Sequence, residues 1–215
     1  APSNRIAVGF IGTGDHGTNW NMSFYRKQKN AQLVAVCDVD RSRREDAKRK
    51  VDEFYSSRQS AGQKPAGCAA YNDFRELIAR KDIDAVDICT PNNLHFEQAR
   101  QVLLSGKHVL CEKPLAMTTA QSAELAFLAQ EKGLITAVNY NLRFYPICQE
   151  ARAKVQAGEV GVPYLVHGGY LQDWLIKETD WNWRLEAGQG GSLRVVGDIG
   201  THWMDLLTYI TGLKI

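Results

Sequence analysis

The 215-residue sequence predicts an α/β protein whose first part is a doubly wound parallel sheet. Three observations support this class. Short apolar runs suited to buried strands alternate with amphipathic segments suited to helices, a glycine-rich turn follows the first apolar run, and polar residues follow several others. Ligands of such sheets bind at the carboxyl ends of the strands.

The first strand and turn contain the most informative motif. An apolar run ends in Gly12-x-Gly14-x-x-Gly17, and an amphipathic segment follows at once. The first glycine permits the tight turn, the second lets the backbone approach a pyrophosphate, and the third lets the helix pack on the strand. The turn therefore predicts a dinucleotide site, and Asp15 and His16 inside it are expected cofactor contacts.

A helix over 18–27 is expected after the turn, followed by a buried strand over 33–37. Asp38 ends this strand, close to the spacing of about 20 residues typical of the acid that binds a ribose hydroxyl. The apolar side chains expected to face the sheet from the helix are Trp20, Phe24 and Tyr25.

The next segment, to about residue 54, is expected to form a highly charged helix. Arg41 and Arg43 near its start could receive a 2′-phosphate, but a carboxylate at Asp38 would repel that group, so we expect NAD rather than NADP. The remaining charges indicate a solvated helix face with i,i+4 pairs. The expected pairs are Glu45 with Arg49 and Asp46 with Lys50.

Further strands and helices continue the alternation to residue 139. Strands are expected near 68–70 and over 85–89, 108–111 and 135–139; helices over 73–80, 95–105 and 119–132; and an exposed loop over 56–67. Gly12, Asp38, Thr90, Asn92 and Lys113 all fall at strand ends and are expected to meet at one edge of the sheet. His95 and Glu112 beside them are also expected to contact the cofactor.

A second domain is expected over 140–215, after a nucleotide-binding domain over 1–139. Its predicted elements are a helix from Pro146 to Gly158, a strand over 164–171 with one exposed face, and a closing helix over 198–211. A single strand cannot bury its face without partners. We therefore expect the beginning of an α+β domain with an open, truncated sheet, and a longer chain in the complete protein.

Composition narrows the classes of partner and compartment. The net charge is +2 with both signs mixed along the chain, so no basic stripe indicates nucleic acid, and no apolar run is long enough to span a bilayer. Five cysteines without a Cys-x-x-Cys pair indicate reduced thiols and a cytoplasmic protein. Because the chain starts Ala-Pro-Ser, export after folding is the alternative.

Two later stretches complete a recognisable order of motifs: Glu112-Lys113-Pro114 and Gly197-Asp198-Ile199-Gly200-Thr201-His202. With Gly-x-Gly-x-x-Gly, the acid, Thr-Pro-Asn and Asn-x-Arg-Phe, the chain resembles the glucose-fructose oxidoreductase, inositol dehydrogenase and MocA-like family of nicotinamide-dependent oxidoreductases. The resemblance implies a Rossmann domain and a catalytic set of Lys113, Asp198 and His202 at the nicotinamide. It also places Asn141 and Arg143 near the substrate.

The chemistry of these side chains suits oxidation of a secondary alcohol. Neutral imidazole at His202 can take the hydroxyl proton, Asp198 four residues earlier can orient it or hold a substrate hydroxyl, and Lys113 can stabilise charge on the reacting oxygen. Without the motif order, Asp198 would be read as a helix cap and His202 as a core histidine. Asp and His at this spacing can also ligate a metal, but no third ligand is evident nearby, so no metal is expected.

The sequence thus predicts an NAD(P)-dependent dehydrogenase acting on a sugar, a polyol or a related compound, and a homo-oligomer when the chain is full length. Trp174 is expected either to line the sugar pocket or to pack in the core. Two alternatives stay open. One is an NAD-dependent glycoside-cleaving enzyme that oxidises a ring carbon transiently and eliminates the leaving group. The other is a non-catalytic regulator that keeps the nucleotide site.

Overall fold

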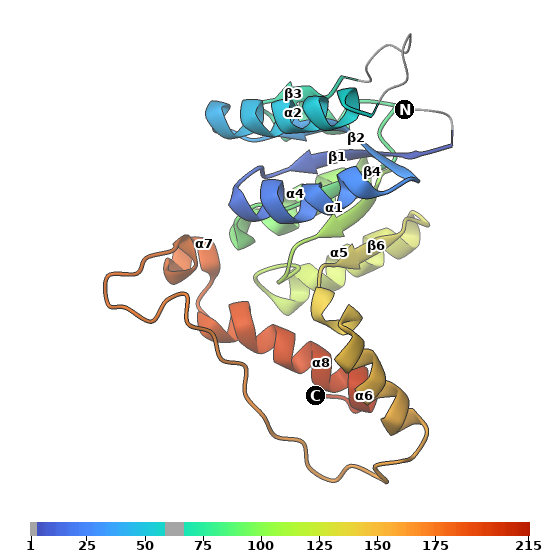
Figure 1. Cartoon of the computed structure of the whole chain (residues 1–215), viewed down its shortest axis with the longest axis vertical. Coiled ribbons are helices and arrows are strands. Elements are labelled where there is room, and N and C mark those ends of the chain that lie inside the picture. The colour runs from blue at the N-terminus through green and yellow to red at the C-terminus, as the bar shows by residue number, and fades with distance from the viewer. Residues whose placement is uncertain (1–3, 59–66) are drawn as a thin grey trace. The chain divides into compact units, whose positions relative to one another are not determined.

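The computed structural model describes residues 4–58 and 67–215, so most of the loop expected over 56–67 lies outside the described residues. The chain divides into two compact units (Figure 1). The first comprises residues 1–90 and 94–138, and the second comprises residues 91–93 and 139–215.

The first unit contains a six-stranded parallel sheet in the order β3-β2-β1-β4-β5-β6. This order confirms the doubly wound sheet predicted from the sequence. The chain adds β2 and β3 on one side of β1 and then crosses to the other side, so the strand order reverses between β1 and β4. Ligands of such sheets bind outside the carboxyl ends of the strands at this point of reversal. The strands are β1 (Ile6–Ile11), β2 (Ala31–Cys37), β3 (Ala69–Tyr71), β4 (Ala85–Ile88), β5 (His108–Cys111) and β6 (Thr136–Val138).

Helices cover both faces of this sheet (Figure 1). Successive side chains of a strand point to opposite faces, so Phe10 of β1 joins one core cluster and Ile11 joins the other. The first cluster includes side chains of α1 and α2, and the second includes side chains of α3, α4 and α5. The helices are α1 (Met22–Lys27), α2 (Arg41–Ser56), α3 (Phe74–Ile78), α4 (Asn92–Leu104) and α5 (Thr119–Glu131).

The helix expected over 18–27 differs from the prediction at its start. A π-helical segment, η1 (His16–Asn21), precedes α1. Trp20 and Phe24 are 59% and 58% exposed, so the expectation that they face the sheet is wrong, whereas Tyr25 packs against the core as expected. A π turn holds more residues than an α turn and therefore rotates the following side chains around the axis. Met22 takes the buried position instead.

The charged helix is α2, and one of its two expected ion pairs is present. Lys50 Nζ lies 2.9 Å from Asp46, as predicted. Arg49 pairs with Asp46 and with Glu53 rather than with Glu45, so that expected pair is wrong. Both actual partners of Arg49 are also three or four residues away, and spacing alone cannot choose among several carboxylates on one face.

The second unit is mainly helical in its regular parts. Its longest helices are α6 (Pro146–Gln156), which confirms the prediction of a helix from Pro146, and α8 (Thr201–Thr211). The two pack together, and Arg152 donates from Nη1 to the carbonyl of Tyr209 at 2.7 Å. The shorter elements are η2 (Asn141–Phe144), η3 (Trp183–Leu185), α7 (Ala187–Gly190) and the π-helical η4 (Val196–Gly200).

The strand expected over 164–171 is wrong. This segment has no regular secondary structure, and the side chains of Tyr164 and Leu171 are 96% and 94% exposed. A strand needs a neighbour to accept and donate its backbone hydrogen bonds, and the described part of this unit contains no other strand. The sequence over 164–171 therefore has the alternation of side chains typical of a strand, but no neighbouring strand pairs with it.

All five cysteines fall within the described residues, and none forms a disulfide. Among the described residues, no helix is both long and apolar enough to cross a bilayer.

Candidate functional site

The glycine turn after β1 requires glycine at two positions for packing. Gly12 has φ +92°, and its N–H donates to the Cys37 carbonyl at 2.9 Å. A Cβ on Gly17 would lie 2.3 Å from the Gly12 carbonyl oxygen. A Cβ on Gly14 would meet nothing within 4 Å, so the backbone at Gly14 faces open space. This is the exposed backbone surface that a pyrophosphate requires.

Asp38 at the end of β2 fastens this turn. Its Oδ2 accepts from the Thr13 N–H at 2.8 Å and from the Thr13 hydroxyl at 3.2 Å. Its Oδ1 accepts from the Asp40 N–H at 2.9 Å. An ionised carboxylate has about four acceptor positions, so Asp38 retains capacity for ribose hydroxyls.

A pocket of about 210 Å³ lies beside the turn, lined in part by Gly14, Asp15, Arg43 and Lys50. Its two cations have acidic partners. Lys50 Nζ lies 2.9 Å from Asp46, and Arg43 Nε lies 3.7 Å from Asp40. The local charge is therefore nearly balanced. Asp15, which is exposed, accepts from Asn19 Nδ2 at 2.7 Å.

The loops after β4 and β5 are joined by a buried histidine. His95 is fully buried, with its Nδ1 2.7 Å from the Pro114 carbonyl and its Nε2 2.8 Å from the Thr90 carbonyl. Burial lowers the pKa of His95, and a neutral ring can donate to only one of these oxygens at a time. Thr90 also donates from its hydroxyl to Gln98 at 2.6 Å. Asn92 is buried at the start of α4.

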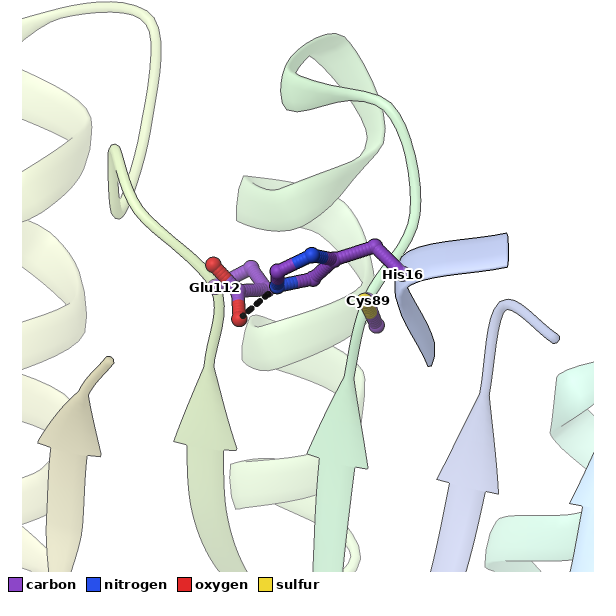
Figure 2. Close-up of side chains that lie close together, drawn as sticks. All are labelled: His16, Cys89 and Glu112. Carbon is purple, nitrogen blue, oxygen red and sulfur yellow. Dashed lines mark hydrogen bonds and ion pairs between the residues drawn. The ribbon is translucent and has the colours of Figure 1, made fainter. Parts of the chain in front are cut away.

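Glu112, directly after β5, is the centre of a polar cluster at the carboxyl edge of the sheet. His16 Nε2 lies 3.2 Å from its Oε1, and Asn21 Nδ2 donates to the same oxygen at 3.0 Å. The Lys113 N–H donates to Oε2 at 3.2 Å. Cys89, after β4, lies against the same group (Figure 2). The sequence indicated His16, Glu112 and Lys113, but Asn21 and Cys89 carried no motif.

A second carboxyl group lies beneath this cluster. Asp87 of β4 is 1% exposed and faces the helix α1 side of the sheet, because it alternates with Val86 and Ile88 in the opposite core cluster. Burial, and then the charge of Glu112, raise the pKa of Asp87 to about 8, so the group is largely protonated at neutral pH. A charged residue inside an apolar strand was the sequence signal for this site.

In the second unit, Asp198 and His202 lie at the junction of η4 and α8. Asp198 Oδ1 is 3.2 Å from Nε of Arg184. The ring of His202 stacks on Tyr170 with centroids 6.1 Å apart and meets Tyr140 edge-on at 5.7 Å. Because a guanidinium stands beside Asp198, the metal alternative for this pair is disfavoured, as the sequence also indicates.

The Arg184 guanidinium lies between aromatic rings as well. Its Cζ is 4.4 Å from the centroid of Trp183 and 5.9 Å from that of Trp174. Trp174 is 41% exposed, so it is neither a core residue nor fully free of contacts. Sequence reasoning named this tryptophan but missed Arg184, although an arginine inside a tryptophan-rich segment was a visible signal.

Of the two expected substrate contacts near α6, Asn141 is exposed in η2. Arg143 donates from Nε to Asp205 at 2.7 Å and lies 5.1 Å from the centroid of Tyr209. Arg143 thus braces α8, an interaction that the motif did not indicate.

The expected site residues fall into two sets. The first unit brings one set together along the ends of β1, β2, β4 and β5: Gly12, Gly14, Asp15, His16, Gly17, Asp38, Thr90, His95, Glu112 and Lys113. The second unit contains Asn92, Asn141, Arg143, Trp174, Asp198 and His202.

Comparison with known proteins adds to this geometry. D-glucoside 3-dehydrogenase of Escherichia coli is 30% identical over 210 residues, which are 98% of this chain and 55% of that protein. Levoglucosan dehydrogenase of Pseudarthrobacter phenanthrenivorans is 37% identical over 142 residues, 66% of this chain and 36% of that protein. The chain thus spans about a third to just over half of these relatives.

The chain is also similar to solved structures of oxidoreductases. An oxidoreductase domain protein from Kribbella flavida has a TM-score of 0.83 at 32% identity, with 97% of this chain and 54% of that chain covered. A levoglucosan dehydrogenase in complex with NADH and levoglucosan has a TM-score of 0.80 at 29% identity, with the same coverage.

Family models match both units of the chain. Residues 6–140 match the model described as an oxidoreductase family with an NAD-binding Rossmann fold, and residues 148–215 match the GFO/IDH/MocA C-terminal domain. The chain therefore belongs to the GFO/IDH/MocA family of oxidoreductases.

Proposed function

We propose that the protein containing this chain is an NAD-dependent dehydrogenase that oxidises a secondary hydroxyl of a sugar or a related polyol. The observation that carries the proposal is the edge of the sheet, where the open backbone at Gly14 and the carboxylate of Asp38 are joined through Thr13. The backbone at Gly14 offers space for a pyrophosphate, and the carboxylate of Asp38 offers acceptors for the hydroxyls of a ribose. Family membership supports the same cofactor.

The charges beside the turn favour NAD over NADP. A 2′-phosphate would approach the carboxylate of Asp38, and the nearby cations Arg43 and Lys50 already have the acidic partners Asp40 and Asp46. An additional phosphate would therefore gain little attraction from these two cations and would meet the negative charge of Asp38.

In this proposal three side chains act on the substrate. When bound, nicotinamide accepts the hydride from the reacting carbon. His202 removes the hydroxyl proton, Asp198 holds a substrate hydroxyl or orients the imidazole, and Lys113 hydrogen-bonds the reacting oxygen. The guanidinium of Arg184 supports this role, because its contact with Asp198 at 3.2 Å holds the carboxylate in one orientation.

The surroundings of Asp198 and His202 support a carbohydrate as the substrate class. Tyr140 and Tyr170 flank the imidazole, and Trp174 and Trp183 flank Arg184. Aromatic faces suit the C–H surfaces of a sugar, while the adjacent charged groups can hydrogen-bond its hydroxyls. The related proteins named above act on a glucoside and on levoglucosan according to their names.

The test uses the full-length protein with a panel of sugars and polyols, and follows nicotinamide absorbance. We expect NADH to accumulate with at least one sugar, and Lys113→Ala and His202→Ala to lower kcat by at least about 100-fold while NADH still binds. Matched controls are Lys132→Ala and His167→Ala, two exposed residues of the same types. Wild-type rates in the Lys113 and His202 variants would refute the assignment.

The same assay separates the two alternatives. A glycoside-cleaving enzyme would release a sugar product without net NADH, because the hydride would return within each turnover. A non-catalytic regulator would bind NADH but show neither product.

Two further expectations belong to this proposal. Five cysteines without a disulfide favour a reducing compartment, and hence the cytoplasm. The exposed apolar side chains over 164–176 favour coverage by further chain or by a second subunit in a homo-oligomer. Size-exclusion chromatography with light scattering on the full-length protein tests the second point.

A further inference from the structure

Three side chains of different chemistry converge at the carboxyl ends of the central strands. His16 follows β1, Cys89 follows β4 and Glu112 follows β5 (Figure 2). One ligand atom of each lies within 4.8 Å of those of the other two, and the His16 Nε2 to Glu112 Oε1 distance is 3.2 Å. We propose that these residues form a binding site for a borderline-soft divalent transition-metal ion, of which Zn²⁺ is the best match.

The donor set selects this class of ion. A thiolate is a poor ligand for Mg²⁺ and Ca²⁺, whereas nitrogen, sulfur and carboxylate oxygen together are typical of zinc. Binding removes the proton of the Cys89 thiol, which passes to solvent, and it requires the His16 ring to carry its proton on Nδ1. No electron is transferred in this step.

The geometry requires only a small closure. Zinc bonds of about 2.0–2.3 Å in a tetrahedral arrangement place ligand atoms roughly 3.3–3.6 Å apart, so separations up to 4.8 Å need to shrink by about 1 Å. The His16 side chain is 49% exposed and lies at the first residue of η1, so it has room to move. The other two ligands follow the paired strands β4 and β5, and the N–H groups of Cys89 and Glu112 each donate to a strand carbonyl at 2.8 Å.

Neighbouring groups already orient the carboxylate. Asn21 donates to Glu112 Oε1 at 3.0 Å, and the Lys113 N–H donates to Oε2 at 3.2 Å. Such outer hydrogen bonds hold a ligand in place and commonly change metal affinity by about 10–100-fold. The inference does not rest on the proposed roles of Asp198 and His202. His16 and Glu112 are also expected cofactor contacts, so the ion and the dinucleotide would compete for these two residues.

Co²⁺ titration of the full-length, tag-free, reduced protein tests the site. A thiolate bound to Co²⁺ gives an absorption band in the near ultraviolet. Zn²⁺ should displace the Co²⁺ ion and so remove this band. We expect one equivalent of Co²⁺ to produce this band, Cys89→Ser to abolish it, and His16→Gln to weaken Co²⁺ binding at least about tenfold. His16 is exposed, so its variant tests the site even if the Cys89 variant fails to fold.

The matched control is Cys148→Ser, because the other three cysteines, Cys37, Cys68 and Cys111, are buried. The control should keep the band at full intensity. Absence of the band in wild type at micromolar Co²⁺, or an unchanged band in Cys89→Ser, overturns the proposal. A band that disappears in Cys148→Ser and persists in His16→Gln overturns it as well.

Discussion

Two alanine substitutions in one turn should separate folding from cofactor binding. In Gly17→Ala the new Cβ would lie 2.3 Å from the Gly12 carbonyl oxygen, more than 1 Å inside an ordinary contact. Gly12 cannot retreat, because its N–H is bonded to Cys37 and a Cβ at its own position would lie 2.5 Å from the Cys89 carbonyl. Overpacking in a well-packed region typically costs about 1–3 kcal/mol. Here the new Cβ is attached directly to one backbone segment and the clashing oxygen belongs to another, so we expect about 3 kcal/mol of destabilisation.

In Gly14→Ala the new Cβ meets nothing within 4 Å, and we expect the free energy of unfolding to change by less than about 0.5 kcal/mol. The same methyl group would occupy the surface proposed for the pyrophosphate. NADH affinity should therefore fall at least about tenfold, which corresponds to about 1.4 kcal/mol. The substitution should thus weaken NADH binding while leaving the stability of the fold nearly unchanged.

Urea unfolding followed by circular dichroism measures the first quantity, and NADH fluorescence titration measures the second. A Gly14→Ala protein as unstable as Gly17→Ala would refute the packing argument. A Gly14→Ala protein that binds NADH like wild type would refute the pyrophosphate assignment.

Three other substitutions test the remaining groups. Asp38→Asn should lower the ratio of the NADPH to the NADH dissociation constant about tenfold, because the charge that repels a 2′-phosphate is lost; an unchanged ratio in fluorescence titrations would contradict this. Arg184→Gln should reduce kcat/KM about tenfold by releasing Asp198, and equal loss in Arg184→Lys would show that charge alone is insufficient. Folded Asp87, with its pKa of about 8, keeps a proton that the unfolded chain releases near pH 4, so the free energy of unfolding should fall, by about 1 kcal/mol per unit, as the pH rises between those values. Asp87→Asn should remove this slope in urea titrations with a chelator present, whereas the exposed control Glu131→Gln should keep it.

The sheet was predictable because its signals are local. Each strand of the first unit is a short apolar run, and the alternation with helices defines the parallel order. The side-chain directions of the first helix were not predictable, because the π turn at His16–Asn21 changes the rotation per residue without a sequence signal. The expected strand over 164–171 failed for the opposite reason: the local pattern was present, but a strand also needs a neighbour distant in sequence.

The residues of the candidate site were also predictable where their signals are local, and not where they depend on contacts between distant parts of the sequence. Glycines, Asp38, Glu112 and Lys113 were indicated by motifs at strand ends, and the structure places them on one edge. Asn21 and Arg184 were missed because each acts through another side chain, Glu112 or Asp198, and only the fold brings those pairs together. Sequence motifs therefore indicate the side chains expected to touch a ligand more readily than the side chains that hold those groups in place.

Both core clusters of the sheet are built from residues before 139. Within residues 4–58 and 67–215, the buried apolar side chains of both clusters therefore all belong to the first unit. Substitutions after Asn139 should therefore leave the apolar packing of the sheet unchanged, which unfolding of the first unit in urea would measure. The division of the chain thus separates the residues that stabilise the sheet from the residues of the second unit, so the two sets can vary independently.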